Sequence, residues 1–181
     1  MDHVISGVAK FQKEVYPNKK ATFQKLATGQ NPEVLFITCS DSRIDPNLVT
    51  QTDPGELFIC RNAGNIVPPH SNQTGGMTAS IEFAVAALGV SHIVICGHTD
   101  CGAMKGAINP EGLSALPHVK EWLGHCRVAT EVVKERCGHS DLSIDDLEAV
   151  TKENVVQQIQ HLRTHPAVAA KIATGQVKLH G

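Results

Sequence analysis

The sequence predicts an α/β fold built around a parallel sheet, and two kinds of pattern carry that prediction. Short, continuously apolar runs such as residues 34–38 (VLFIT) are typical of strands buried on both faces of a parallel sheet. Longer segments with apolar residues at helical spacing separate these runs along the chain. Strands that alternate with helices in this way favour a parallel sheet flanked by helices.

Residues 1–29 predict a helical arm made of two helices. Pro17 interrupts the first helical pattern, and Gly29 ends the second. The apolar residues that define the first helix recur at helical spacing at Val4, Ile5, Val8 and Phe11. The arm has too little chain beside it to bury this apolar stripe, so we expect it to pack across a partner subunit.

The next segment predicts three strands and one helix. The strands are expected at residues 34–38, 57–60 and 92–96, which share the same apolar character. A helix over residues 77–88 follows Gly75 and Gly76 and lies between the second and third strands. It ends at Gly89, a residue that commonly terminates helices.

The C-terminal half predicts further helices and the start of another strand. Residues 116–137 predict one amphipathic helix, residues 145–162 one or two more, and Pro166 opens a last helix. Residues 177–179 predict a strand. Because the sequence stops at Gly181, we expect that the C-terminal end of the sheet is truncated.

Composition and charge limit the classes of partner. The 181 residues are 41% hydrophobic and 19% charged, which predicts one domain spanning residues 1–181. Sixteen basic and eighteen acidic residues give a net charge of −2, without a run of like charge that would bind nucleic acid or an anionic membrane. The apolar segments are too short to cross a bilayer, and the N-terminus lacks a signal-peptide pattern. We therefore expect a cytoplasmic protein.

Two of the predicted strands end in residues that bind metals. The strand at 34–38 runs into Cys39, and the strand at 92–96 is followed by His98 and Cys101. Ligands of open parallel sheets gather just beyond the carboxyl ends of the strands, so these side chains can meet there. Thiolate and imidazole are ligands that tetrahedral Zn²⁺ prefers, and three protein ligands leave one position for water or substrate.

Other interpretations of the cysteines and histidines stay open at this point. A lone cysteine at a strand end is often inert and buried, and Cys60 and Cys96 within the predicted strands fit that description. A second metal set would require a turn near either end of the 126–137 segment, because one continuous helix would separate its members by about 16 Å. The members of that set are His125, Cys126, Cys137 and His139. The other histidines are expected at the surface or in an interface: His3, His70, His92, His118, His161, His165 and His180.

The strand-end motifs resemble the signature of the β-class carbonic anhydrases. The residues that carry the resemblance are Cys39-Ser40-Asp41-Ser42-Arg43 and His98-Thr99-Asp100-Cys101. The likeness continues through residues 54–58, 61–68 and 81–85 and is greatest to the bacterial and cyanobacterial branch with a plant-like substrate pocket. The family implies a mostly parallel sheet of four to five strands flanked by helices, and a homodimer or higher homo-oligomer.

The resemblance also implies a reaction and a role for each motif residue. Members of the family reversibly hydrate carbon dioxide to bicarbonate and a proton with a zinc-bound hydroxide, using one zinc ion per chain. The likeness makes Cys39, His98 and Cys101 the zinc ligands. Asp41 and Arg43 become a gating dyad. While Arg43 holds Asp41, the Asp41 carboxylate orients the hydroxide, and when Arg43 releases it, Asp41 binds zinc itself. Substrate contacts are implied for Gln30, Phe58, Ala63 and Phe83.

Three alternatives to carbon dioxide hydration are compatible with the motifs. Relatives of the family use the same ligands to hydrolyse carbon disulfide or carbonyl sulfide. A non-catalytic zinc scaffold would keep the ligands, although metal binding alone does not require Asp41 and Arg43. A thiol hydrolase would use Cys39 with a histidine base and no metal. The resemblance adds the bacterial carboxysome to the cytoplasm as a location, and two thiolates on zinc favour activity at alkaline pH.

Overall fold

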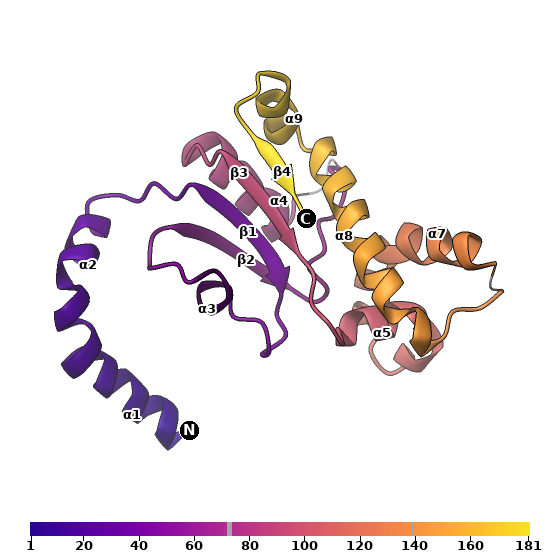
Figure 1. Ribbon diagram of the computed structural model, residues 1–181, viewed down its shortest axis with the longest axis horizontal. Coiled ribbons are helices and arrows are strands. Elements are labelled where there is room, and N and C mark those ends of the chain that lie inside the picture. The colour runs from indigo at the N-terminus through magenta and orange to yellow at the C-terminus, as the bar shows by residue number, and fades with distance from the viewer. Residues whose placement is uncertain (72–73, 139) are drawn as a thin grey trace.

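The computed structural model describes residues 1–71, 74–138 and 140–181. Within these residues, four parallel strands form one sheet in the order β2-β1-β3-β4 (Figure 1). The strands are β1 (Val34–Cys39), β2 (Leu57–Asn62), β3 (His92–Cys96) and β4 (Lys178–His180). The predicted α/β fold with a parallel sheet flanked by helices is confirmed.

The register of the sheet brings the carboxyl ends of three strands to one edge. β1 lies between β2 and β3 and is buried on both faces, which explains its continuous apolar sequence. Cys39 pairs with Asn62 of β2, and Thr38 pairs with Cys96 of β3. The loops that follow the three strands therefore start side by side.

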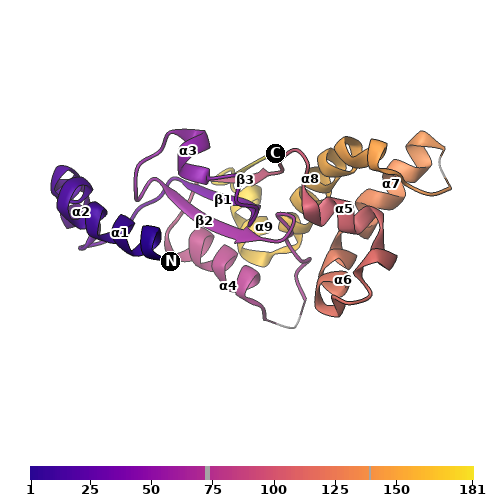
Figure 2. The same cartoon turned by 90° about the horizontal axis from the view of Figure 1, so that it is seen from below.

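Helices cover the two faces of the sheet. The helix α4 (Gly76–Glu82), extended by the π-helical turn η3 (Phe83–Ala87), packs with α9 (Pro166–Ala173) below the sheet, and α3 (Pro46–Thr50) lies on the opposite side (Figure 2). The main core joins the sheet to α4, η3, α9 and the long helix α8 (Leu147–Thr164). Its fully buried members include Leu35, Ile37, Ile81, Ile93, Leu162 and Val168.

A second group of helices gathers at the carboxyl edge of the sheet. They are α5 (Gly102–Ile108), α6 (Pro117–Leu123) and α7 (Arg127–Cys137), with the short turns η4 (Pro110–Leu113), η5 (Gly124–Cys126) and η6 (Ile144–Asp146). Their apolar residues form a second core that includes both Cys39 and Cys101. The end of β1 is therefore packed inside this second core.

The prediction of one helix over residues 116–137 is wrong. α6 ends at Leu123, the 3₁₀ turn η5 follows, and α7 begins at Arg127. Glycine is a poor helix former, and Gly124 stands at the point where the helical geometry changes. The apolar periodicity continues on both sides of this break, which is why the pattern alone resembled one helix.

The expectation that His165 lies at the surface is also wrong. Its side chain is 3% exposed and its Nε2 hydrogen-bonds to the carbonyl of Pro68 at 3.0 Å. His165 joins α8 to α9 and occupies the N-cap position of α9 before Pro166. Burial lowers the pKa of His165 from its ordinary value of 6.5.

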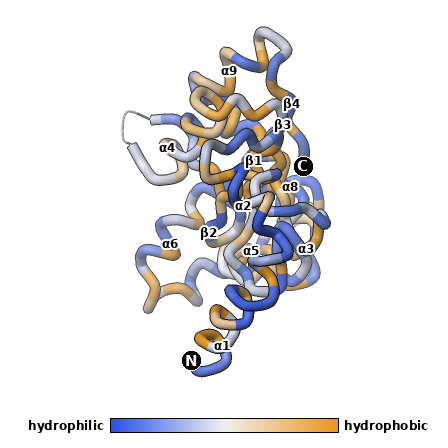
Figure 3. The backbone as a smooth tube through the Cα atoms, turned by 90° about the vertical axis from the view of Figure 1, so that its left-hand side faces the viewer, coloured by the Kyte–Doolittle hydropathy of each residue, from blue (hydrophilic) through white to orange (hydrophobic). Residues whose placement is uncertain are grey.

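The N-terminal arm reaches away from the sheet (Figure 1). It consists of α1 (Asp2–Lys10), the π-helical turn η1 (Phe11–Val15), the turn η2 (Pro17–Lys19) and α2 (Lys20–Leu26). The rings of Phe11, Tyr16 and Phe23 pack together, with centroids 5.6 to 6.4 Å apart. No residue of α1 or α2 is buried, and apolar residues alternate with polar ones along the exposed α1 (Figure 3). None of the helices in the described residues has both the length and the apolar character needed to cross a bilayer.

Candidate functional site

Three metal-binding side chains converge at the carboxyl edge of the sheet. Cys39 ends β1, while His98 and Cys101 lie in the turn between β3 and α5. The sulfurs of Cys39 and Cys101 are 3.9 Å apart, and one donor atom from each of the three residues lies within 4.8 Å of the others. Two sulfurs bound 2.3 Å from a tetrahedral zinc ion would be about 3.8 Å apart. The separation of the sulfurs therefore fits a shared zinc ion.

The imidazole of His98 presents a free nitrogen to this site. Its Nδ1 is 2.9 Å from the carbonyl oxygen of Thr99, which only accepts, so Nδ1 carries the proton. The lone pair then lies on Nε2, which is buried and has no hydrogen-bond partner among the described residues. A buried polar atom without a partner costs about 1–3 kcal/mol. A cation between the two sulfurs would supply that partner.

The two thiols of the donor set interact directly. The hydrogen bond between their sulfurs lowers the pKa of Cys39 and raises the pKa of Cys101. The backbone N–H of Gly64 also donates to the Cys39 sulfur at 3.3 Å. Both contacts favour a thiolate at Cys39, and a bound metal ion would displace the thiol proton that remains on the pair.

The structure does not assemble the second candidate metal set. Cys126 is buried at the end of η5, whereas Cys137 is exposed at the far end of α7. Within the described residues, Cys39, His98 and Cys101 are the one group of three donors close enough for a metal ion. His139 lies outside the described residues.

Asp41 and Arg43 form a two-pronged ion pair beside the donor atoms. Arg43 donates from Nε to Oδ1 of Asp41 at 2.9 Å and from Nη2 to Oδ2 at 2.8 Å. These hydrogen bonds hold the pKa of Asp41 well below its usual range and raise the pKa of Arg43. Oδ2 of Asp41 is 3.9 Å from Nε2 of His98, so an ionised carboxylate stands next to the donor set.

Asp100 is a second partner of Arg43 that sequence reasoning missed. Nη1 of Arg43 donates to Oδ2 of Asp100 at 2.7 Å, and Nη2 donates to its carbonyl oxygen at 2.8 Å. The hydrogen bond from Lys105, together with that from Arg43, lowers the pKa of Asp100. The sequence feature that could have indicated this role is the position of Asp100 inside the motif His98–Cys101. Arg43 therefore ties the loop after β1 to the turn after β3.

Arg61 is another residue whose role the sequence did not reveal. Its Nε donates to the carbonyl of Cys39 at 2.9 Å, and its Nη2 donates to the carbonyls of Asp41 and Ile44 at 2.7 Å each. One guanidinium thus satisfies three carbonyls of the loop that carries Cys39 and Asp41. This loop is held from β2 as well as from its own strand.

The comparisons with known proteins agree on one family. A family model described as carbonic anhydrase matches residues 34–181. The solved structure of the β-carbonic anhydrase CcaA has a TM-score of 0.95 and 41% identity, covering 100% of this chain and 88% of that one. The chain belongs to the β-carbonic anhydrase family. It is therefore an enzyme of that family, as its resemblance implied.

Relatives of this carbonic anhydrase come from several groups of organisms. The carbonic anhydrase of Pseudomonas aeruginosa is 47% identical over 181 residues, which are 100% of this chain and 81% of that protein. The carbonic anhydrase of Synechococcus elongatus is 45% identical, and this chain spans 66% of its length. A structure of two tetrameric β-carbonic anhydrases from Sordaria macrospora has a TM-score of 0.84 at 32% identity, covering 99% of this chain and 89% of that one.

The residues implied to contact substrate are divided between two places. Ala63 follows β2 directly, next to Gly64, and its carbonyl accepts a hydrogen bond from Nε1 of Trp122 at 2.9 Å. Phe58 pairs with Leu35, four positions before the level of Cys39, which corresponds to about 13 Å along the strand. Phe83 packs against Phe58 with ring centroids 6.0 Å apart and is 49% exposed.

Gln30 lies apart from the donor set. It is exposed between α2 and β1, at the amino end of the strand whose carboxyl end carries Cys39. Within one chain of this carbonic anhydrase, Ala63 is thus beside the donor set. Gln30 and Phe58 lie toward the amino ends of β1 and β2, and Phe83 packs against Phe58.

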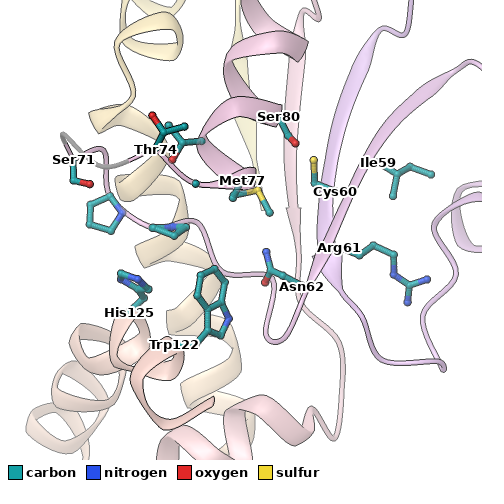
Figure 4. Close-up of a pocket in the computed structure, with 15 residues that line it drawn as sticks. Ile59, Cys60, Arg61, Asn62, Ser71, Thr74, Met77, Ser80, Trp122 and His125 are labelled. Carbon is teal, nitrogen blue, oxygen red and sulfur yellow. The ribbon is translucent and has the colours of Figure 1, made fainter. Parts of the chain in front are cut away.

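A pocket of about 800 Å³ lies along the edge strand β2 (Figure 4). Cys60 and Asn62 of β2 point toward Met77 of α4 and Trp122 of α6, while Ile59 and Arg61 point to the other side of the strand (Figure 4). The donor side chains are not among the described residues that line it. Burial raises the pKa of Cys60, so this thiol stays protonated and unreactive there.

Proposed function

We propose that this carbonic anhydrase reversibly hydrates carbon dioxide to bicarbonate and a proton with one zinc ion per chain. Cys39, His98 and Cys101 would hold the ion. The observation that carries the proposal is the buried Nε2 of His98, which lacks a partner among the described residues and faces two sulfurs 3.9 Å apart. Family membership supports the reaction, since relatives named carbonic anhydrase match the whole chain.

The bound zinc ion would supply a Lewis acid that lowers the pKa of water and so makes it a nucleophile. Asp41 has the complementary task of orienting that nucleophile. Its carboxylate is ionised and can accept a hydrogen bond from a water molecule beside the donor set, aiming a lone pair of that water at carbon dioxide. Arg43 contributes by holding both carboxylate oxygens, which fixes the direction in which Asp41 accepts.

The ion pair would also act as a gate. While Arg43 holds Asp41, the carboxylate is kept away from the metal position. Release of Asp41 would let it become a fourth metal ligand and close the site. Asp100 binds the same guanidinium through Nη1 while Asp41 is held, so Arg43 would keep a partner in either state.

Substrate walls would come from a partner subunit. Gln30 and Phe58 lie at the end of the sheet opposite the donor set of their own chain, and Phe83 packs against Phe58 of β2, which is an edge strand. A second chain docked along β2 could present these residues to its neighbour's metal while covering the pocket there. Residues 1–181 would then act as one catalytic domain in a homodimer or higher oligomer.

The arm would complete that assembly. Its exposed apolar residues, such as Ile5 at 63% and Phe11 at 41%, have no covering surface within the described residues of the chain. Packing of residues 1–29 across the partner would bury them. The test is the oligomeric state at micromolar concentration: a monodisperse monomer that still hydrates carbon dioxide would contradict the proposal.

The reaction is tested by comparing substrates on one zinc-loaded preparation. Rates with carbon dioxide, carbonyl sulfide and carbon disulfide should rank carbon dioxide first. A higher rate with either sulfur compound would assign the chain to that hydrolysis instead. A zinc-loaded protein inactive toward all three gases would support a scaffold, and full activity without metal would support a thiol hydrolase.

A further inference from the structure

The loop after β2, residues 63–67, makes a backbone contact with the donor set. The N–H of Gly64 donates to the sulfur of Cys39 at 3.3 Å. The backbone of Gly64 has a φ of +83°, and a Cβ at this position would lie 3.0 Å from Met104 Cε and 3.1 Å from Ala103 Cβ. The close approach therefore depends on glycine and on an accurately held loop.

Two buried amides of α8 hold this loop. Nδ2 of Asn154 donates to the carbonyl of Gly64 at 3.1 Å, and Nε2 of Gln158 donates to Oδ1 of Asn154 at 2.8 Å. Oε1 of Gln158 accepts from the backbone N–H of Val67 at 2.8 Å. Asn154 is 1% exposed and Gln158 is 0% exposed. Residues four apart share one face of a helix, so both amides point at the same loop.

Two further side chains complete the attachment. The ring of His161, one turn beyond Gln158, hydrogen-bonds through Nδ1 to the carbonyl of Val67 at 2.7 Å. Asn62 accepts from the N–H of Ile66 at 2.7 Å and donates to its carbonyl at 2.8 Å. The N–H and carbonyl groups of Gly64, Ile66 and Val67 therefore all have identified partners.

The direction of this hydrogen-bond chain is fixed. Asn154 donates toward the loop and accepts from Gln158, while Gln158 donates toward Asn154 and accepts from Val67. Burial of two amides is costly unless each is satisfied, and apolar side chains would fill a helix–loop contact at less cost. The two amides fix the direction of the Gly64 peptide group through hydrogen bonds, whereas apolar side chains would leave that direction unspecified.

We propose that Asn154 and Gln158 are positioning residues of the metal centre, which keep the Gly64 N–H aimed at the Cys39 sulfur. The inference rests on the proposed zinc site and adds to it an outer layer supplied by α8. Hydrogen bonds to metal ligands orient them and tune the metal, and their loss commonly costs about 10–100-fold in metal affinity or activity.

The test compares zinc affinity and the ligand field in matched variants. Asn154→Leu and Gln158→Met replace each amide with an apolar side chain of similar size. Competition with a chromophoric chelator should show a loss of zinc affinity of about 10–100-fold in both. In the cobalt-substituted proteins, the thiolate-to-cobalt charge-transfer band should shift. Val168→Ala is the control, because Val168 is 0% exposed in the main core on α9 and has no role in the loop contacts described.

The control separates positioning from general stability. Val168→Ala should lower the melting temperature while keeping wild-type zinc affinity and the wild-type cobalt spectrum. If both amide variants lost stability but kept the affinity and spectrum of the control, the inference would be overturned. Should Asn154→Leu fail to fold, Gln158→Met decides by the same two readouts. A wild-type protein that bound no zinc would overturn the proposed function and this inference with it.

Discussion

Replacement of Gly64 by alanine should destabilise the protein more than an ordinary glycine replacement. A residue with a Cβ pays about 1–2 kcal/mol for left-handed backbone geometry, and Gly64 has a φ of +83°. The added Cβ would also lie 3.0 Å from Met104 Cε and 3.1 Å from Ala103 Cβ. Met104 is 0% exposed, so it has little room to withdraw, and such overpacking adds about 1–3 kcal/mol.

Gly89→Ala is the matched control for this prediction. Gly89 has a φ of +70°, but its added Cβ would meet no heavy atom of the described residues within 4 Å. The control therefore measures the backbone cost alone. For a chain of this length, each kcal/mol lowers the melting temperature by about 2–4 °C.

The assay is thermal unfolding of the metal-loaded and chelator-treated proteins. Gly64→Ala should melt about 2–12 °C below Gly89→Ala, and it should bind zinc more weakly because the Gly64 N–H moves away from Cys39. Equal melting temperatures for the two variants would refute the close packing of this loop against α5.

Three further predictions concern the dyad, a buried histidine and the metal. Arg43→Ala should free Asp41 and slow carbon dioxide hydration about tenfold or more while zinc stays bound; loss of zinc, or a near wild-type rate, would make the pair structural. The folded-state pKa of His165 lies below 6.5, so the unfolded chain takes up the proton first as the pH falls. The free energy of unfolding should therefore decrease as the pH is lowered from 6.5. Urea unfolding at about pH 8 and about pH 5.5 should show a smaller drop for His165→Gln, and equal drops would contradict this. Chelation should lower the melting temperature by about 8–16 °C relative to protein with free zinc a thousandfold above its dissociation constant, whereas unchanged melting would exclude a tightly held ion.

The strands and the donor set could be predicted because their signals are local. A continuously apolar run such as β1 indicates a doubly buried strand, and the strand ends that lead to Cys39 and His98 lie at the same edge of any parallel sheet. They meet here because β1 pairs with β3. The break at Gly124 could not be predicted because the apolar periodicity continues through α6 and α7. The burial of His165 could not be predicted because it depends on a hydrogen bond to the carbonyl of Pro68, which lies 97 residues earlier in the chain.

The outer parts of the site depend on contacts between distant segments. Asn154 and Gln158 are spaced like an ordinary polar helix face, and only the fold turns that face inward toward residues 63–67. Asp100 pairs with Arg43 across the gap between two strand ends. The substrate role that the resemblance implies for Gln30 would depend on the proposed second chain, which no pattern within one sequence specifies.

Zinc titration of metal-free protein with stopped-flow carbon dioxide hydration tests the central claim most directly. The rate should rise in proportion to added zinc and level off at one ion per chain, and Cys101→Ser should fail to recover the wild-type rate, since it removes one of the three donors. Full activity before any zinc is added, or zinc saturation without hydration of carbon dioxide, would contradict the assignment of Cys39, His98 and Cys101 as a catalytic zinc centre.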